Sequence, residues 1–147
     1  MAACHVSHAH ESPLFEDEHC SIYEDHIVIK SYFFPVGHKT VRFNTIHSIN
    51  THEQLGLSPI QMKEWGMGLS NIWWALDWDR AGIQLTGPSP ELELIIIKVE
   101  HDVIRKGFSV SRKSDALALL RKLVPGAFEK GSHELIQLTA GTSTKRD

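Results

Sequence analysis

The fold is decided by the run IVIKSYFFPVGHKTVRFNTIHSIN, residues 27–50 of a chain of 147 residues. From Ile27 to Phe34, β-branched and aromatic residues alternate with a period of two, which is typical of a β-strand. The turn residues Pro35 to Gly37 end this strand, and the alternation resumes from about Thr40 to Asn50. The run therefore predicts two strands that pair as an antiparallel hairpin.

Further strands are expected on the C-terminal side of this hairpin. A serine, a proline and a glutamine within residues 58–61 first predict a short helical turn. Strands are then predicted at Ile72–Trp78, Ile83–Thr86, Leu92–Glu100 and Phe108–Ser111. The apolar centre of the third of these indicates a strand that is buried on both faces or lies under a helix.

One amphipathic helix is expected near the C-terminus. Ser114 suits a helix cap, the apolar residues that follow recur at helical spacing, and Pro125 with Gly126 ends the helix. The sequence thus predicts three parts: a flexible, histidine-rich leader (residues 1–20), one domain (21–124) and a loosely ordered tail (125–147). The domain is mainly β with one C-terminal helix.

Three core patterns resemble the pleckstrin-homology-like (PH-like) superfamily, in particular its small single-domain members related to bacterial PH domains. They are residues 27–35, residues 39–43 leading into 46–49, and residues 107–111 leading into 116–120. The resemblance covers roughly residues 21–124 and implies an open barrel of two antiparallel sheets capped by the helix. Six strands are predicted, whereas the family has seven.

Composition excludes several function classes. The formal net charge is -3, which gives no general attraction to nucleic acid. Residues 1–20 carry neither the cations nor the apolar run of a secretory signal. The apolar runs, such as Leu94–Ile97, are far shorter than the ~20 residues of a membrane span. We expect a soluble, cytoplasmic protein, alternatively one that is peripheral to a membrane.

The histidine-rich leader raises the question of a metal site. Its ligand-type residues are Cys4, His5, His8, His10, His19 and Cys20. The residue types suit zinc, but their spacing matches no zinc motif. The sequence predicts reduced thiols, no metal and no cofactor.

All four tryptophans lie between residues 65 and 78. Strand periodicity puts Trp74 and Trp78 on the same face, which we expect to be core. Trp73 falls on the opposite face, and Trp65 stands beside a glycine. Trp65 and Trp73 are therefore the predicted contacts for a protein or peptide partner, since large amphipathic rings often serve interfaces.

Lipid-binding PH domains carry a basic cluster on the first hairpin, and the matching residues here are Lys30, Lys39 and Arg42. Lys39 and Arg42 are three positions apart, so on a strand they point to opposite faces and depart from the family's clamp. Binding of acidic phospholipid through this hairpin is the alternative function.

The sequence contains no hydrolase elbow, phosphate loop or dinucleotide fingerprint, and no catalytic residue is assigned. We expect a non-enzymatic interaction module for a protein or peptide. A phospholipid adaptor is the alternative, and a small-molecule-binding barrel ranks third.

Overall fold

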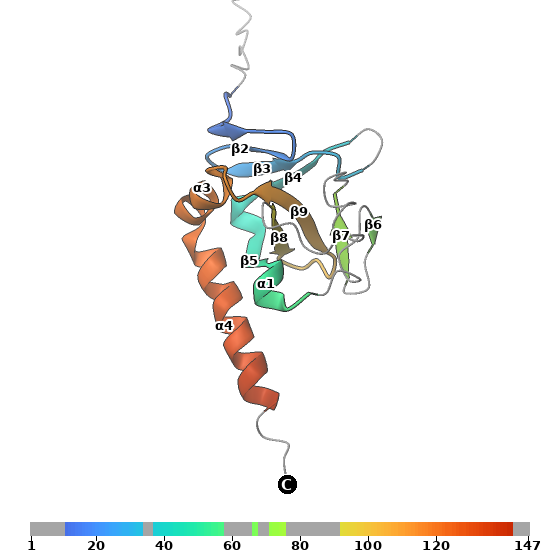
Figure 1. The fold of residues 1–147 in the computed structure, drawn as a ribbon, viewed down its shortest axis with the longest axis vertical. Coiled ribbons are helices and arrows are strands. Elements are labelled where there is room, and N and C mark those ends of the chain that lie inside the picture. The colour runs from blue at the N-terminus through green and yellow to red at the C-terminus, as the bar shows by residue number, and fades with distance from the viewer. Residues whose placement is uncertain (1–10, 34–36, 58–65, 68–70, 76–91, 143–147) are drawn as a thin grey trace, which may run out of the picture.

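The computed structural model describes residues 11–33, 37–57, 66–67, 71–75 and 92–142 of the chain. These residues form a mainly β structure of two sheets with helices at the C-terminal end (Figure 1). The described strands make two open sheets rather than one closed barrel.

Sheet A is antiparallel and follows chain order. It consists of β1 (Phe15–Glu16), β2 (Cys20–Ile22), β3 (His26–Ile29) and β4 (Lys39–Arg42). β3 pairs with β4 in the register Ile27 to Val41, so the predicted first hairpin is confirmed.

Sheet B has the strand order β5-β8-β9-β7-β6. Its strands are β5 (Ile46–Thr51), β6 (Gly66–Met67), β7 (Ile72–Trp74), β8 (Leu92–Val99) and β9 (Arg105–Ser111). The predicted strands at 72–78, 92–100 and 108–111 correspond to β7, β8 and β9. β7 runs parallel to β9, whereas the other pairs are antiparallel.

The second predicted strand, Thr40–Asn50, is two strands in different sheets. A 3-10 turn, η1 (Phe43–Thr45), separates β4 from β5. The amide of Phe43 donates to the Asp25 carbonyl just before β3, while the Thr45 carbonyl accepts from the amide of Glu100 beyond β8. These long-range bonds carry the chain from one sheet to the other, and periodicity alone did not reveal the break.

The main core lies between the two sheets and is closed by the C-terminal helices. Sheet A contributes Ile22, Ile27 and Ile29, each fully buried. Sheet B contributes alternate positions of its central strands, including Ile95 and Phe108, which are register partners. This face of sheet B is the inner face, and the opposite face is the outer one.

A second, smaller cluster covers part of the outer face. It contains Ile72, Trp74, Leu94 and Ile96. The Trp74 ring lies over Gly107, where an added Cβ would come within 2.4 Å of it, so only glycine fits on β9 at this point. The prediction that Trp74 is core is confirmed, and Trp78 lies outside the described residues.

The first helix, α1 (His52–Leu55), begins at a capping box. The Thr51 side chain accepts from the Gln54 amide, and the Gln54 side chain accepts from the Thr51 amide. Gly56 ends the helix with a left-handed backbone, φ 62°. The helical turn predicted at residues 58–61 and the strand at 83–86 lie outside the described residues.

The C-terminal helices are α3 (Ala116–Leu123) and α4 (Pro125–Thr142). α4 runs along one side of the molecule (Figure 1), and its first half packs on β5 with Ala127, Phe128 and Gly131 buried. The prediction of a loosely ordered tail from residue 125 is therefore wrong for this part. Proline lacks an amide hydrogen, so Pro125 both ends α3 and suits the first turn of α4.

Sheet A also begins inside the predicted leader. Asp17 turns the chain between β1 and β2, because its Oδ1 accepts the amides of His19 at 2.8 Å and Cys20 at 2.9 Å. Cys20 is fully buried, and burial raises the pKa of its thiol to about 12. The assignment of residues 1–20 to a flexible leader is thus wrong from Phe15 onward.

Candidate functional site

A pocket of about 410 Å³ lies on the outer face of sheet B, against α4. This volume falls within the range of about 300 to 1,000 Å³ that is typical of ligand sites. Its walls come from β5, α1, the residue before β7, β8, the β8–β9 turn, β9 and α4. The lining residues are Ser48, Asn50, Leu55, Asn71, Ile96, Lys98, Val103, Arg105, Gly131, Glu134 and Leu135.

Asn50 on β5 is a buried polar residue of this pocket. The residue is 7% exposed, and its Nδ2 has no hydrogen-bond partner among the described residues. An unsatisfied buried amide costs about 1 to 3 kcal/mol, which is unusual in a folded protein unless a ligand or water completes it. The terminal torsion of asparagine is soft, so this amide can turn toward a bound group.

Two cations line the pocket beside Asn50. Lys98 on β8 is the register partner of Ser48, and Ile96, two residues earlier on the same face, is the partner of Asn50. Arg105 begins β9, the next strand of the sheet. Burial lowers the pKa of Arg105, whereas nearby Glu134 raises it; the guanidinium stays charged at neutral pH.

Glu134 on α4 is the only carboxylate among these lining residues, and it is bound on several sides. Its Oε1 lies 2.6 Å from His47 Nε2 and 4.0 Å from Lys98 Nζ, and Ser48 Oγ donates to its Oε2 at 3.4 Å. The other nitrogen of His47, Nδ1, lies 3.0 Å from Glu100 Oε1. Hydrogen bonds to Glu100 and Glu134 raise the pKa of His47.

The described pocket residues do not pair His47 with Ser48 as base and nucleophile. Both ring nitrogens of His47 are bound by carboxylates, so neither is directed at the Ser48 hydroxyl, which itself bonds to Glu134. A serine nucleophile needs a base within hydrogen-bond reach of its own oxygen. The pocket therefore offers donors and charges to a ligand without a triad.

Of the predicted partner-binding tryptophans, the structure describes Trp73, and Trp65 lies outside the described residues. Trp73 is half-buried against the main core, and its Nε1 donates to the Tyr32 carbonyl at 2.9 Å. Its ring centroid lies 6.3 Å from that of Phe33, which is 48% exposed. The more exposed aromatic surface at this place is Phe33.

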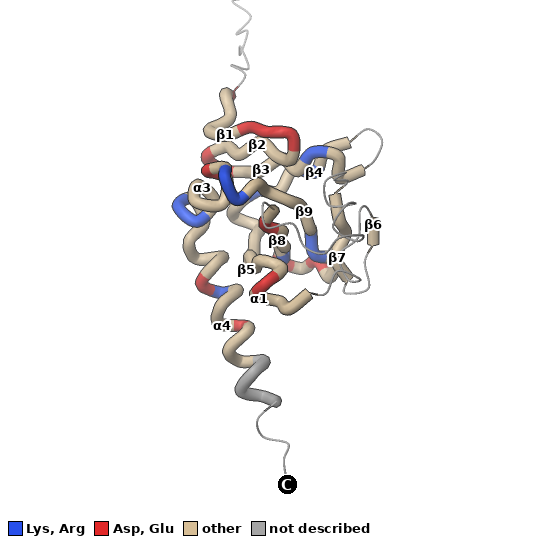
Figure 2. Tube along the Cα trace, viewed as in Figure 1, with Lys and Arg blue, Asp and Glu red and all other residues tan. Residues whose placement is uncertain are grey.

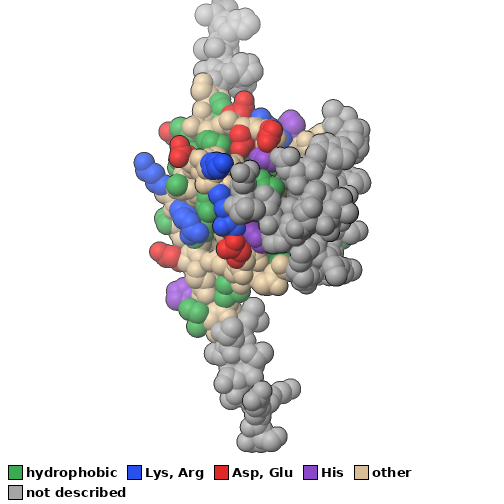
Figure 3. All heavy atoms as spheres, viewed as in Figure 1, with side chains coloured by type: hydrophobic (Ala, Val, Ile, Leu, Met, Phe, Trp, Pro, Cys, Tyr) green, Lys and Arg blue, Asp and Glu red, His purple; other side chains and the backbone are tan. Residues whose placement is uncertain are grey.

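The predicted phospholipid residues lie on β4 or directly after β3, with acidic groups nearby. Lys30 Nζ donates to the Asp17 carbonyl at 2.7 Å and lies 3.7 Å from Glu16. Arg42 Nη1 lies 3.7 Å from Asp25. Figure 2 shows acidic residues around the β1–β2 turn, and Figure 3 shows acidic and basic side chains interspersed on the visible face. Lys39 is half-buried on β4.

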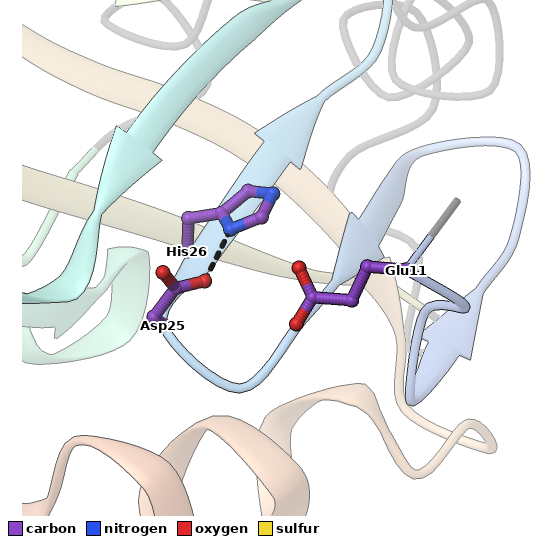
Figure 4. Close-up of side chains that lie close together, drawn as sticks. All are labelled: Glu11, Asp25 and His26. Carbon is purple, nitrogen blue, oxygen red and sulfur yellow. Dashed lines mark hydrogen bonds and ion pairs between the residues drawn. The ribbon is translucent and has the colours of Figure 1, made fainter. Parts of the chain in front are cut away.

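Among the described residues, one group has the composition of a metal site. Glu11, Asp25 and His26 each place a ligand atom within 4.8 Å of the others (Figure 4). The Asp25 carboxylate bonds to His26 Nδ1 and lies near Arg42, and the His26 hydrogen bond lowers the pKa of Asp25. A carboxylate with partners of its own on an exposed surface is common without an ion, so no metal is assigned to this group.

The sequence held few signals for the pocket. Asparagine is disfavoured in strands, so Asn50 at the end of a β-branched run was a usable one. Glu134 had none, because it stands 87 residues from His47 in a segment without strong periodicity. Lys98 and Arg105 looked like ordinary surface cations.

Comparison with models of protein families, with characterised proteins and with solved structures finds no match to this chain. Within its described part, no helix is long and apolar enough to cross a membrane.

Proposed function

We propose that this protein is a non-enzymatic interaction module of PH-like fold, and that it binds a peptide segment of a partner protein in the outer-face pocket of sheet B. The observation that carries the proposal is the buried amide of Asn50 in a pocket of about 410 Å³. Peptide groups are rich in carbonyl acceptors, which such a donor recognises.

The surroundings of Asn50 also favour a peptide. The apolar side chains Leu55, Ile96 and Val103 line the same pocket, and Val103 is 82% exposed at the β8–β9 turn. A mixture of apolar walls and a few placed polar groups is the usual composition of a binding site.

The PH-like assignment is supported by the order of elements: an antiparallel four-stranded sheet, a second sheet and a C-terminal helix packed on it. The parallel pairing of β7 with β9 departs from a simple antiparallel meander. A peptide is favoured over acidic phospholipid because Lys30 and Arg42 lie beside carboxylates. A small molecule between the two sheets is disfavoured, because the main core fills that space.

The experiment is a screen of random 12-residue synthetic peptides on an array, probed with the purified full chain and with Asn50→Leu. Leucine has the branching of asparagine but no donor. We expect a consensus of bound peptides for the wild type that weakens at least tenfold for the variant. No bound peptide, or equal binding by both proteins, contradicts the proposal.

A further inference from the structure

The charged side chains that line the pocket with Asn50 indicate which chemical group of a ligand would bind there. Lys98 and Arg105 supply two positive charges to the lining, and Glu134 supplies one negative charge. Among the described lining residues, cations therefore exceed carboxylates by one. A carboxylate carries one negative charge, whereas a phosphate carries nearly two and adds more repulsion from Glu134.

Both carboxylate oxygens of Glu134 are in contact with other side chains of the protein. His47 Nε2 lies 2.6 Å from Oε1, and Ser48 donates to Oε2. Lys98 Nζ stands farther away, 4.0 Å from Oε1, and the Lys98 side chain is 46% exposed. The lysine is thus held loosely enough to turn to a second anion, whereas both carboxylate oxygens of Glu134 are already in contact with His47 and Ser48.

Burial strengthens the attraction for an anion on the other side of the pocket. Arg105 is partly removed from water, and its lowered pKa reflects that loss of solvation. A charge in a less polar environment interacts more strongly with an opposite charge than it does in water. Together with the Asn50 amide, these groups offer donors from three neighbouring strands, β5, β8 and β9.

We propose that the pocket binds a carboxylate of the peptide, which is held by Lys98, Arg105 and the side-chain amide of Asn50. This inference rests on the proposed function and deepens it. The carboxylate comes either from an Asp or Glu side chain or from a free C-terminus, and the two sources offer the same group to the pocket.

The test uses NMR of the full chain labelled with 15N, with the Asn50 side-chain amide signal assigned through Asn50→Leu. Three probes are titrated: Ac-Ala-Leu-Glu-Leu-Ala-NH2, its glutamine counterpart Ac-Ala-Leu-Gln-Leu-Ala-NH2, and the glutamine peptide with a free C-terminal carboxylate. We expect the first or the third to shift the Asn50 signal with a Kd at least about tenfold lower than that of the neutral peptide, as one charge-assisted hydrogen bond gives. Whichever of the two binds more tightly identifies the source.

A matched pair of lysine variants tests the contact itself. Lys98→Gln removes the pocket charge, and Lys122→Gln removes an exposed charge on α3 that does not line the pocket. We expect Lys98→Gln to weaken the acidic peptide about tenfold and leave the neutral one unchanged, as expected for one charge-assisted hydrogen bond, with no effect of Lys122→Gln.

The outcomes separate the two proposals. Equal shifts of the Asn50 signal by acidic and neutral peptides overturn the carboxylate and leave peptide binding intact. No shift with any of the three probes, together with an empty peptide screen, overturns both. Equal losses from Lys98→Gln and Lys122→Gln also overturn the carboxylate contact, because the preference is then a general charge effect.

Discussion

His47 on β5 and Glu134 on α4 lie 2.6 Å apart, from Nε2 to Oε1, although 87 residues separate them in the chain. Glu100, which follows β8, bonds to the other ring nitrogen. One histidine therefore links the C-terminal helix to the edge strand and to the end of the neighbouring strand. The same contact holds in place the one carboxylate among the described pocket residues.

We expect this link to make stability depend on pH. The hydrogen bonds to Glu100 and Glu134 raise the pKa of His47 above its ordinary value of 6.5. A raised histidine pKa stabilises the fold fully below the unfolded pKa, and this contribution is lost as the pH rises through the folded pKa. His47 also lowers the pKa of Glu100 below its ordinary 4.5, and that contribution is lost at acid pH.

The window of greatest effect therefore lies between about pH 5 and 6.5. Urea unfolding of wild type and His47→Gln should differ by about 1 kcal/mol at pH 6, as for other partly exposed ion pairs, and by less at pH 9. His133→Gln is the control, because this exposed α4 histidine has no carboxylate partner among the described residues, and this variant should show no pH-dependent difference. A gap between wild type and His47→Gln that stays constant from pH 6 to 9 contradicts the prediction.

The close approach of α4 to β5 depends on Gly131. A Cβ at this position would lie 2.4 Å from the Ile49 carbonyl oxygen and 2.9 Å from Asn50 Nδ2. Gly131→Ala should lower the free energy of unfolding by about 1 to 3 kcal/mol, because the helix must move away from the strand. It should also disturb the pocket, which Gly131 and Asn50 line.

Gly126 is the matched control on the same helix. A Cβ there meets no atom within 4 Å, so Gly126→Ala should leave stability unchanged or raise it by up to about 1 kcal/mol through helix propensity. Urea unfolding measures both variants. Equal behaviour of the two would show that the packing of α4 on β5 is not as described.

Lys106 is a buried cation on the inner face of β9. Its Nζ donates to Asp102 Oδ2 at 2.5 Å and to the Ile104 carbonyl at 2.6 Å. Asp102→Asn keeps an acceptor for the Ile104 amide but removes the negative charge of residue 102. The variant should lower the free energy of unfolding by about 3 kcal/mol, because the buried ammonium group of Lys106 loses its charged partner.

The double variant Lys106→Met with Asp102→Asn tests the cause. Removing both charges leaves no unpaired ion, so we expect it to regain at least half of the stability lost by the single variant. A double variant no more stable than Asp102→Asn would mean that the loss came from the turn rather than from the ion pair. Chemical denaturation at pH 7 provides the comparison.

Local periodicity was sufficient to predict the first hairpin, β8, β9 and α3, because each is a continuous run with one dominant pattern. It failed at η1, where the chain changes sheets through hydrogen bonds to distant residues such as Asp25 and Glu100. It failed again at Pro125, which marks the end of one helix and the start of another.

The pocket could not be predicted from the sequence, for a related reason. Its polar residues come from β5, β8, β9 and α4, and only the packing of α4 across the sheet brings Glu134 beside Lys98. The predicted sites followed the visible features, tryptophans and a basic hairpin. A single asparagine in a strand is a weak pattern. Whether it marks a binding site depends on whether its side chain is buried, which the sequence alone does not show.

Asn50→Leu tests the central claim most directly, because the claim is that this buried amide serves a ligand rather than the fold. The variant removes a donor that has no partner among the described residues, and we expect its free energy of unfolding to equal or exceed that of the wild type by up to about 2 kcal/mol. Binding of the acidic peptide should be lost in the same protein. A variant that is strongly destabilised, or one that still binds the peptide with wild-type affinity, would contradict the claim.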